Sequence, residues 1–166
     1  NYGLSELSLS ILRECPETAR LRRLAREDLA FRRAVIGPDD GVLPTIMQYV
    51  PTHTYLEALP DAAGRPELVV SCLDPARRLP LLRYNTHDVA ALLSHDRLAA
   101  VLRDFGREDL IPRARLPLAL MRGKMRALRR ADGSAIFPEQ VKECLYAMTE
   151  LAGDVTGRFC LWDEPD

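Results

Sequence analysis

Three short segments of the chain combine aromatic, polar and flexible residues in patterns that suit nucleotide chemistry. The first is residues 1–6, with the sequence NYGLSE, where a ring, a glycine, a hydroxyl and a carboxylate follow closely on one another. In such a loop Tyr2 can stack on a base and Ser5 can bond a phosphate oxygen. Glu6 can hold Mg²⁺, because this hard cation takes carboxylate oxygens together with substrate phosphates.

The second segment is residues 80–89, with the sequence PLLRYNTHDV. It predicts a polar loop directly after an apolar strand, where functional residues often lie on a rigid support. Asp88 can accept hydrogen bonds from the vicinal hydroxyls of a ribose. Two plainer roles stay open: Asp88 as a turn or helix-cap residue, and His87 as an exposed, hydrogen-bonded histidine.

The third segment is residues 122–141, with the sequence RGKMRALRRADGSAIFPEQV. It predicts a basic hairpin followed by a helix. Its arginines suit phosphate binding, and they equally suit an edge strand that charge protects from aggregation.

The elements that must position these segments follow from hydrophobic periodicity and turn residues. A helix is expected first, then a run of short strands, then a second helix. Strands of this length and spacing predict a small antiparallel sheet or a partly closed barrel. The expected ranges are 16–35 for the first helix, 43–50, 54–59, 67–72 and 79–84 for the strands, and 95–105 for the second helix.

The prolines at 112 and 117 predict a linker or domain boundary across residues 111–118. Beyond it the pattern indicates a β-β-α-β piece of α+β type. Its expected elements are a strand pair at 118–121 and 125–129, a turn at 131–133, a helix at 138–149 and a strand at 157–162.

Composition narrows the class of protein. The chain has 166 residues, 23 Lys and Arg, 24 Asp and Glu, and a formal net charge of −1, so neither nucleic acid nor a membrane is expected as the main partner. The arginines within residues 16–35 are interleaved with Glu27 and Asp28, which favours a solvated helix face. Without a long apolar run or a signal-peptide pattern, the chain is expected to be cytoplasmic.

The four cysteines form no CxxC pair. In a cytoplasmic protein the simplest interpretation is that all four are reduced thiols. A zinc site made by Cys15, His53 and Cys72 is the alternative, and no local spacing supports it.

Taken together, the three segments resemble the second half of an adenylate-forming enzyme of the phenylacetate–CoA ligase type. Residues 2–6 (YGLSE) resemble the family's aromatic-Gly-x-Ser/Thr-Glu motif, and residues 80–89 resemble its PLIRYRTxDL motif. Residues 123–141 resemble its GRxDDxxxxxGxxVFPxxIE motif, and residues 67–70 (ELVV) resemble its GELVFT strand. The order is the same, and the resemblance covers nearly the whole chain.

The resemblance implies an α+β fold in two parts. Residues 1–113 would be the end of the large AMP-binding domain with a β-rich, barrel-like subdomain. Residues 114–166 would be a truncated small α+β C-terminal domain. The family's phosphate-binding loop would precede residue 1 and its C-terminal lysine would follow residue 166, so this stretch alone is expected to be inactive.

The implied reaction has two steps. A carboxylate attacks the α-phosphorus of ATP to give an acyl-adenylate and pyrophosphate, and the thiol of coenzyme A then attacks the acyl carbonyl to give a thioester and AMP. The small-molecule acid is expected to be aryl or arylacetic, such as phenylacetate, and a homodimer is one option for assembly.

Site residues carry over one by one from the family's motifs. Tyr2 and Gly3 would belong to the nucleotide site, with Tyr2 lining the adenine pocket. Ser5 would bond the α-phosphate, Glu6 would ligate Mg²⁺, and Asp88 would hold the ribose hydroxyls.

Other positions depart from the family's pattern. Lys124, the expected catalytic residue, stands where the family has an arginine that reaches ribose or phosphate, and it keeps the charge without the forked geometry. Arg126 replaces the hinge aspartate, while Asn85 and His87 replace the usual Arg and Gly or Arg. These changes leave two alternatives open: a degenerate non-catalytic or adenylate-only homologue, and acyl transfer to a protein or amine acceptor.

Overall fold

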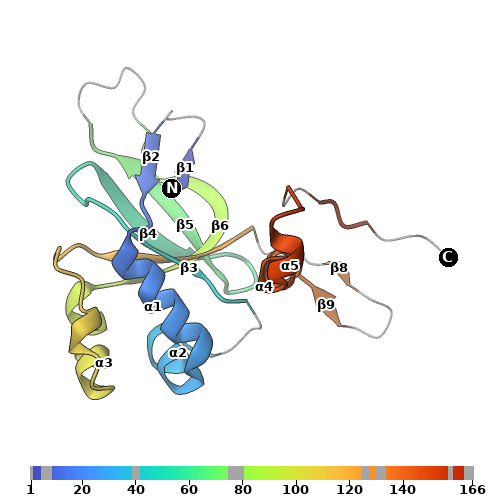
Figure 1. Ribbon diagram of the computed structural model, residues 1–166. Coiled ribbons are helices and arrows are strands. Elements are labelled where there is room, and N and C mark those ends of the chain that lie inside the picture. Colours follow the sequence, from blue (N-terminus) through green and yellow to red (C-terminus); the bar gives the residue numbers. More distant parts are fainter. Residues whose placement is uncertain are drawn as a thin grey trace. The chain divides into compact units, whose positions relative to one another are not determined.

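The computed structural model describes residues 2–4, 9–38, 42–74, 81–124, 128–129, 134–156 and 159–162. The chain forms two compact units, the first made of residues 1–39 and 43–124 and the second of residues 40–42 and 125–166. Helices and antiparallel strands occur in both units (Figure 1). The predicted α+β class is therefore confirmed.

The first unit is built on a five-stranded antiparallel sheet with the strand order β3-β7-β6-β5-β4. The predicted antiparallel sheet is confirmed, but the barrel-like closure is wrong. The reason is that β3 and β4 lie at opposite edges and do not pair with each other among the described residues. The strands are β3 (Thr45–Gln48), β4 (Thr54–Pro60), β5 (Pro66–Cys72), β6 (Tyr84–Leu93) and β7 (Leu118–Gly123).

A separate antiparallel pair of β1 (Tyr2–Leu4) and β2 (Leu9–Leu12), called the β1–β2 hairpin below, contains residues 2–4 of the first motif. Ile11 and Leu12 of this hairpin are buried in one hydrophobic cluster with residues of β4 to β7. The hairpin therefore packs on the sheet.

The two faces of the sheet belong to two hydrophobic cores, as the alternation of side chains along β7 makes clear. Leu118 and Leu120 belong to the core that includes the helices. Ala119 and Met121 belong to the core that includes the β1–β2 hairpin. Burial on both faces explains why β7 has the continuous apolar sequence LALM.

The predicted first helix is two helices, α1 (Pro16–Glu27) and α2 (Leu29–Ile36). Asp28 separates them because its backbone is extended, with φ −115° and ψ 105°, and its carboxylate accepts a hydrogen bond from the backbone N–H of Phe31 at 3.0 Å. An aspartate is a preferred N-cap residue, so a new helix begins where the apolar period alone predicts continuation.

The predicted helix at 95–105 is confirmed as α3 (His95–Asp104), with the Ser94 hydroxyl accepting from the N–H of Arg97 at 3.2 Å. A short 3-10 helix, η2 (Glu108–Leu110), follows it. Helices α1, α2 and α3 gather on the same side of the sheet (Figure 1).

Two strand predictions are wrong in position or pairing. The polar segment expected as a loop after a strand at 79–84 is itself the first half of β6. The strand at 118–121, expected to pair with 125–129, instead lies between β3 and β6 in the main sheet. The first unit accordingly extends to Lys124.

The second unit contains a two-stranded antiparallel pair and two helices. The helix predicted at 138–149 is present up to Ala147, and the strand predicted at 157–162 is absent from its described part, residues 159–162. The elements are β8 (Leu128–Arg129), β9 (Ala135–Ile136), α4 (Pro138–Ala147) and α5 (Thr149–Ala152).

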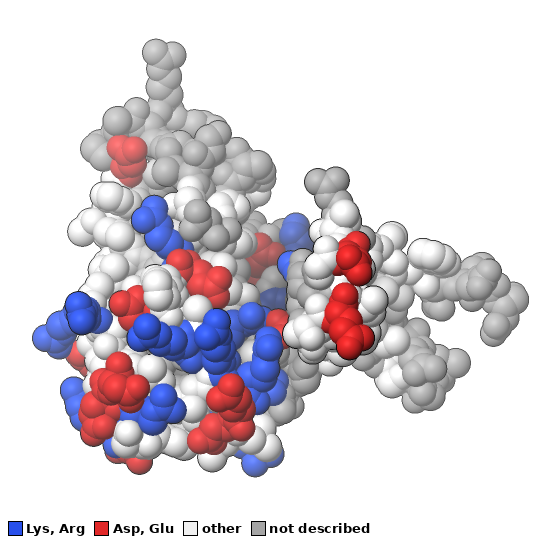
Figure 2. Space-filling model, in the orientation of Figure 1, with Lys and Arg blue, Asp and Glu red and all other residues white. Residues whose placement is uncertain are grey.

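Surface charge on the first unit is mixed. Figure 2 shows blue Lys and Arg side chains with red Asp and Glu side chains beside them on the face that carries α1 and α2. None of the helices in the described ranges has the length and apolar character that a bilayer crossing requires.

Candidate functional site

The first and second motifs meet through one short hydrogen bond. The phenol hydroxyl of Tyr2 donates to Oδ2 of Asp88 at 2.5 Å, although the two residues are 86 positions apart. Asp88 is only 9% exposed, and Tyr2 is half-buried against the hydrophobic core that includes Ile11 and Leu12 of β2. The bond gives this mostly buried carboxylate a hydrogen-bond donor.

Asp88 lies in an irregularity at the start of β6. In the β5–β6 pair Asn85 faces Val69 and Val89 faces Glu67, so three residues of β6 oppose the single residue Leu68 of β5. His87, in the middle of these three, has φ 57°. Such a bulge re-aims side chains, and here it lies at the segment where chemistry was expected.

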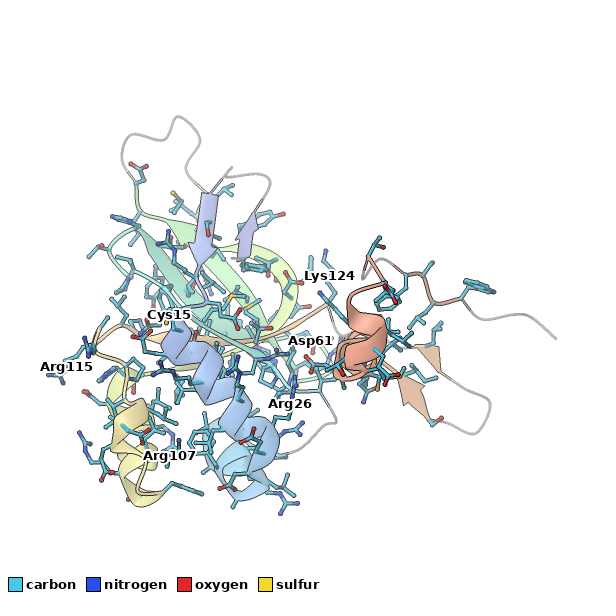
Figure 3. The ribbon with its side chains drawn as sticks, in the orientation of Figure 1. Cys15, Arg26, Asp61, Arg107, Arg115 and Lys124 are labelled. Atoms are coloured by element: carbon cyan, nitrogen blue, oxygen red, sulfur yellow. The ribbon has the colours of Figure 1, made fainter. Side chains whose placement is uncertain are left out.

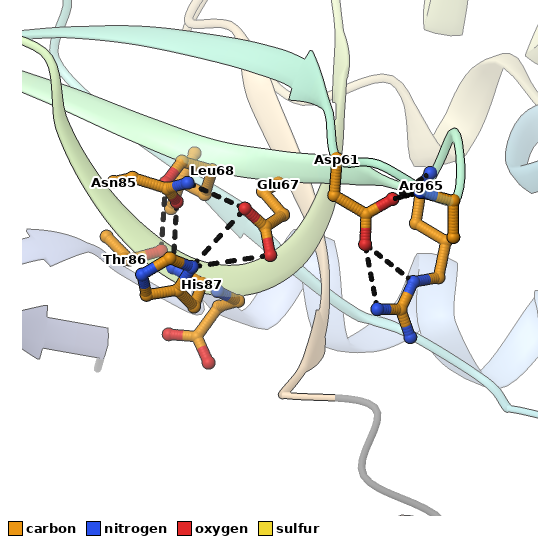
Figure 4. Close-up of polar contacts among 9 residues, drawn as sticks. Asp61, Arg65, Glu67, Leu68, Asn85, Thr86 and His87 are labelled. Atoms are coloured by element: carbon orange, nitrogen blue, oxygen red, sulfur yellow. Dashed lines mark hydrogen bonds and ion pairs between the residues drawn. The ribbon is translucent and has the colours of Figure 1, made fainter.

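Polar contacts hold the bulge against β5 (Figure 4). Oε2 of Glu67 accepts from Nδ2 of Asn85 at 2.6 Å, and the Glu67 carboxylate lies 3.4 Å from Nδ1 of His87. The Thr86 hydroxyl donates to the carbonyl of Leu68 at 2.9 Å. Asn85, Thr86 and His87 are therefore tied to the neighbouring strand.

Contacts within the bulge complete its hydrogen bonding. Oδ1 of Asn85 accepts from the backbone N–H of His87 at 2.9 Å. The backbone N–H of Asp88 donates to Oγ1 of Thr86 at 3.2 Å. Backbone groups that would otherwise lack a strand partner are satisfied by side chains here.

The pairing of β6 with β7 has Lys124 near the Asp88 end of β6. Val89 of β6 pairs with Gly123 of β7, so Asp88 and Lys124 are the residues next to that pair on neighbouring strands. Lys124 is exposed and follows the end of β7 (Figure 3). Gly3, in β1 beside Tyr2, is also exposed.

The structure thus brings Tyr2 and Asp88 into contact and has Lys124 at the adjoining strand end. Ser5, Glu6 and the substituted hinge position Arg126 lie outside the described residues. A carboxylate has about four acceptor positions. Asp88 therefore keeps capacity for hydroxyl donors while it binds Tyr2.

Sequence reasoning missed Glu67 as a site residue and took Asn85 only as a departure from a motif. A usable signal was present, because Glu67 is the one charged residue in the otherwise apolar and uncharged strand PELVVSC. A lone carboxylate at the end of a strand that pairs with a polar segment predicts a cross-strand contact.

A cavity of about 710 Å³ lies elsewhere in the first unit, and neither Tyr2 nor Asp88 lines it. Cys15 and His53 do line it, while Cys72, the third residue of the zinc alternative, does not. Sγ of Cys15 lies 3.6 Å from Oε1 of Gln48. In the described part of the chain no three His, Cys, Asp or Glu residues are grouped to hold a metal ion.

Tyr49, at the wall of the same cavity, has a pKa raised above its usual value, chiefly because burial disfavours the phenolate and also because Tyr55 is nearby. The phenol is therefore neutral at physiological pH. The cavity presents hydroxyl, thiol and amide groups together with the charged side chains of Arg13 and Asp74, beside apolar walls.

Comparison with known proteins finds no matching family model, no similar curated protein and no similar solved structure.

Proposed function

We propose that the chain is part of an ATP-dependent ligase of the phenylacetate–CoA ligase type, which activates an aryl or arylacetic acid as its adenylate and transfers the acyl group to coenzyme A. The observation that carries this proposal is the hydrogen bond between Tyr2 and Asp88. It joins two motifs of the resemblance that are far apart in sequence. The strand register has Lys124 next to Asp88, which supports a part for the third motif in the same nucleotide site.

In this proposal Asp88 accepts hydrogen bonds from the ribose hydroxyls, and Tyr2 presents its ring to the adenine. Lys124 contributes positive charge toward the α-phosphate or ribose. Fixed donors and cations near the phosphorus stabilise the charge that develops as the substrate carboxylate attacks and pyrophosphate leaves. The second step breaks the mixed anhydride, when the coenzyme A sulfur bonds to the acyl carbon and AMP departs.

The phosphate side of the proposed site depends on residues outside the described part. Ser5 is proposed to bond the α-phosphate and Glu6 to hold Mg²⁺. When bound, Mg²⁺ would neutralise phosphate charge. Both assignments rest on the sequence of the first motif.

The test is Asp88→Ala in the full chain. We expect ATP affinity to fall about 10- to 100-fold, because hydrogen bonds to a charged acceptor are worth about 1.5–3 kcal/mol each and every 1.4 kcal/mol is tenfold. Calorimetric titration with ATP and AMP measures this change. Asp96→Ala is the surface control for the loss of one carboxylate, since Asp96 is exposed at the start of α3, beyond the other end of β6.

Unchanged affinity in Asp88→Ala would refute the ribose assignment. Turnover is tested separately, in the whole ligase of which the chain is proposed to be part, by ATP–pyrophosphate exchange and by thioester formation with a panel of aromatic acids. Nucleotide binding without exchange would favour a non-catalytic homologue. Exchange without thioester formation would favour an adenylate-only enzyme or another acyl acceptor.

A further inference from the structure

The carboxylate of Glu67 lies at the centre of the contacts that shape the Asp88 bulge. It binds Asn85 at 2.6 Å on one side of Thr86 and contacts His87 at 3.4 Å on the other. The Glu67 side chain is 16% exposed, whereas that of His87 is 72% exposed. Glu67 is therefore the inner, better-shielded member of this group, and its hydrogen bonds compete less with water.

The backbone that these contacts hold is one that a histidine does not adopt by preference. The φ of 57° at His87 is in the left-handed region, which is sterically unfavourable for a residue with a Cβ. Such a conformation persists only where its surroundings over-determine it. Here Asn85 bonds the His87 backbone N–H and Glu67 holds both side chains.

The next residue along this strained backbone is Asp88, whose carboxylate meets Tyr2. A change in the φ or ψ of His87 rotates the Asp88 side chain away from that position. The direction of the Asp88 carboxylate is therefore set from β5, through Asn85 and His87.

We propose that Glu67 is a positioning residue of the nucleotide site, which fixes the bulge at 85–88 and so aims the Asp88 carboxylate at the ribose. This inference rests on the proposed function and adds to it a residue that does not touch the nucleotide. It also gives a role to Asn85 and His87, since Glu67 acts through both.

The experiment compares Glu67→Ala, Glu67→Gln and Glu67→Asp in the full chain by calorimetric titration with ATP. We expect Glu67→Ala to weaken binding about tenfold, the loss of one charge-assisted hydrogen bond. Glu67→Gln should recover most of the affinity, because its amide oxygen still accepts from Asn85 and its length is unchanged. Glu67→Asp should recover less, because the shorter side chain does not reach both partners.

Asn85→Ala and the double variant Glu67→Ala/Asn85→Ala separate positioning from general destabilisation. If Glu67 acts in part through Asn85, the double variant should lose clearly less ATP affinity than the product of the two single losses, because both single variants remove the Glu67–Asn85 hydrogen bond. Independent structural damage would instead give multiplied losses. Glu57→Ala is the matched control, because Glu57 is also a strand carboxylate with a surface partner, Arg83, at 3.2 Å.

Wild-type affinity in Glu67→Ala, no recovery in Glu67→Gln, or multiplied losses in the double variant would each overturn the inference. Asp88→Ala in the same titration separates this failure from that of the proposed function. If Asp88→Ala loses affinity while Glu67→Ala keeps it, only the positioning role is wrong. If Asp88→Ala also keeps wild-type affinity, the proposed function is wrong and the positioning role falls with it.

Discussion

The contact between Tyr2 and Asp88 is the residue-scale feature on which the site depends. The phenol hydroxyl of Tyr2 donates a hydrogen bond to the mostly buried carboxylate of Asp88. A buried carboxylate without a donor would cost free energy of folding. The pair should therefore stabilise the fold of the unliganded chain as well as order the site.

Tyr2→Phe tests the contribution of this hydroxyl to stability. We expect the free energy of unfolding to fall by about 1–3 kcal/mol, because the ring stays and only the donor to Asp88 is lost. Urea unfolding at pH 7 measures the change. Tyr55→Phe, at a ring that is 55% exposed, should change stability by less than about 0.5 kcal/mol. Equal effects of the two variants would contradict the prediction.

Asp61 is a surface carboxylate with several hydrogen-bond donors in the turn between β4 and β5. It closes the β4–β5 turn by accepting from the backbone N–H groups of Ala63 and Arg65, each at 2.8 Å, and from the Arg65 guanidinium at 2.7 Å (Figure 4). The backbone N–H of Arg65, followed by its guanidinium, holds the pKa of Asp61 below the usual value. A lowered pKa in the folded state means that these bonds stabilise the turn above about pH 4 and are lost as the pH falls through the folded pKa.

Arg65→Ala should raise the titration midpoint of Asp61 toward the ordinary aspartate value, because the guanidinium is removed while the backbone N–H groups remain. Carboxyl carbon chemical shifts followed by NMR from pH 2 to 6 give the midpoint. Arg107→Ala, which removes an arginine that pairs with Asp109 elsewhere, should leave the Asp61 midpoint unchanged. The same midpoint in Arg65→Ala and wild type would contradict the assignment of the guanidinium.

At the scale of elements, the sequence predicted the types correctly where periodicity and caps agree. Helix α3 has both an apolar face and the capping Ser94, and its expected bounds differ from the observed ones by one residue. The helix expected at 16–35 failed because the apolar period runs past Asp28. The hydrogen bond from the Phe31 backbone N–H to the Asp28 side chain starts a new helix, and the spacing of apolar residues does not indicate it.

For the candidate site, the sequence named residues but did not indicate how they are arranged. Tyr2 and Asp88 could be named from their motifs, whereas the bulge depends on cross-strand contacts of Glu67 and Asn85 that need the pairing of β5 with β6. In the same way, the sequence predicts that β7 begins a new domain, because Pro112 and Pro117 precede it. Its pairing with β3 and β6 is a long-range choice that local patterns do not specify.

Phe31→Ala tests the packing of α2 against α3. Phe31 is fully buried and meets Phe105 edge to face, with ring centroids 5.6 Å apart. We expect the free energy of unfolding to fall by about 3–5 kcal/mol, from lost burial and the cavity left behind. Leu29→Ala in the same helix, at a side chain that is 47% exposed, should cost less than about 1 kcal/mol. Urea unfolding of both variants decides the comparison.

At the scale of the molecule, the first unit depends on a strand that lies late in its sequence. β7 fills the position between β3 and β6, and it contributes to the cores on both faces of the sheet. The unit is therefore complete only when the chain has been made as far as Lys124.

Two truncations test this organisation. A chain ending at Lys124 should keep the five-stranded sheet, because every strand of it is retained. A chain ending at residue 113, the boundary predicted from the sequence, should fail to fold, because β3 loses its sheet partner. Circular dichroism and the dispersion of amide NMR signals measure the outcome. Cooperative unfolding of the shorter chain would contradict the role of β7.

The unequal residue count between β5 and β6 also bears on how such a chain can change over evolutionary time. Deleting one residue from 86–88 would shift the register, so that the side chains of one half of β6 would point to the opposite face of the sheet. Either Asp88 would leave Tyr2, or the apolar residues of β6 would leave their cores. A single substitution in the bulge keeps the strand register, but a change of length does not. Length variation among descendants of this chain should collect instead in exposed turns such as 61–65.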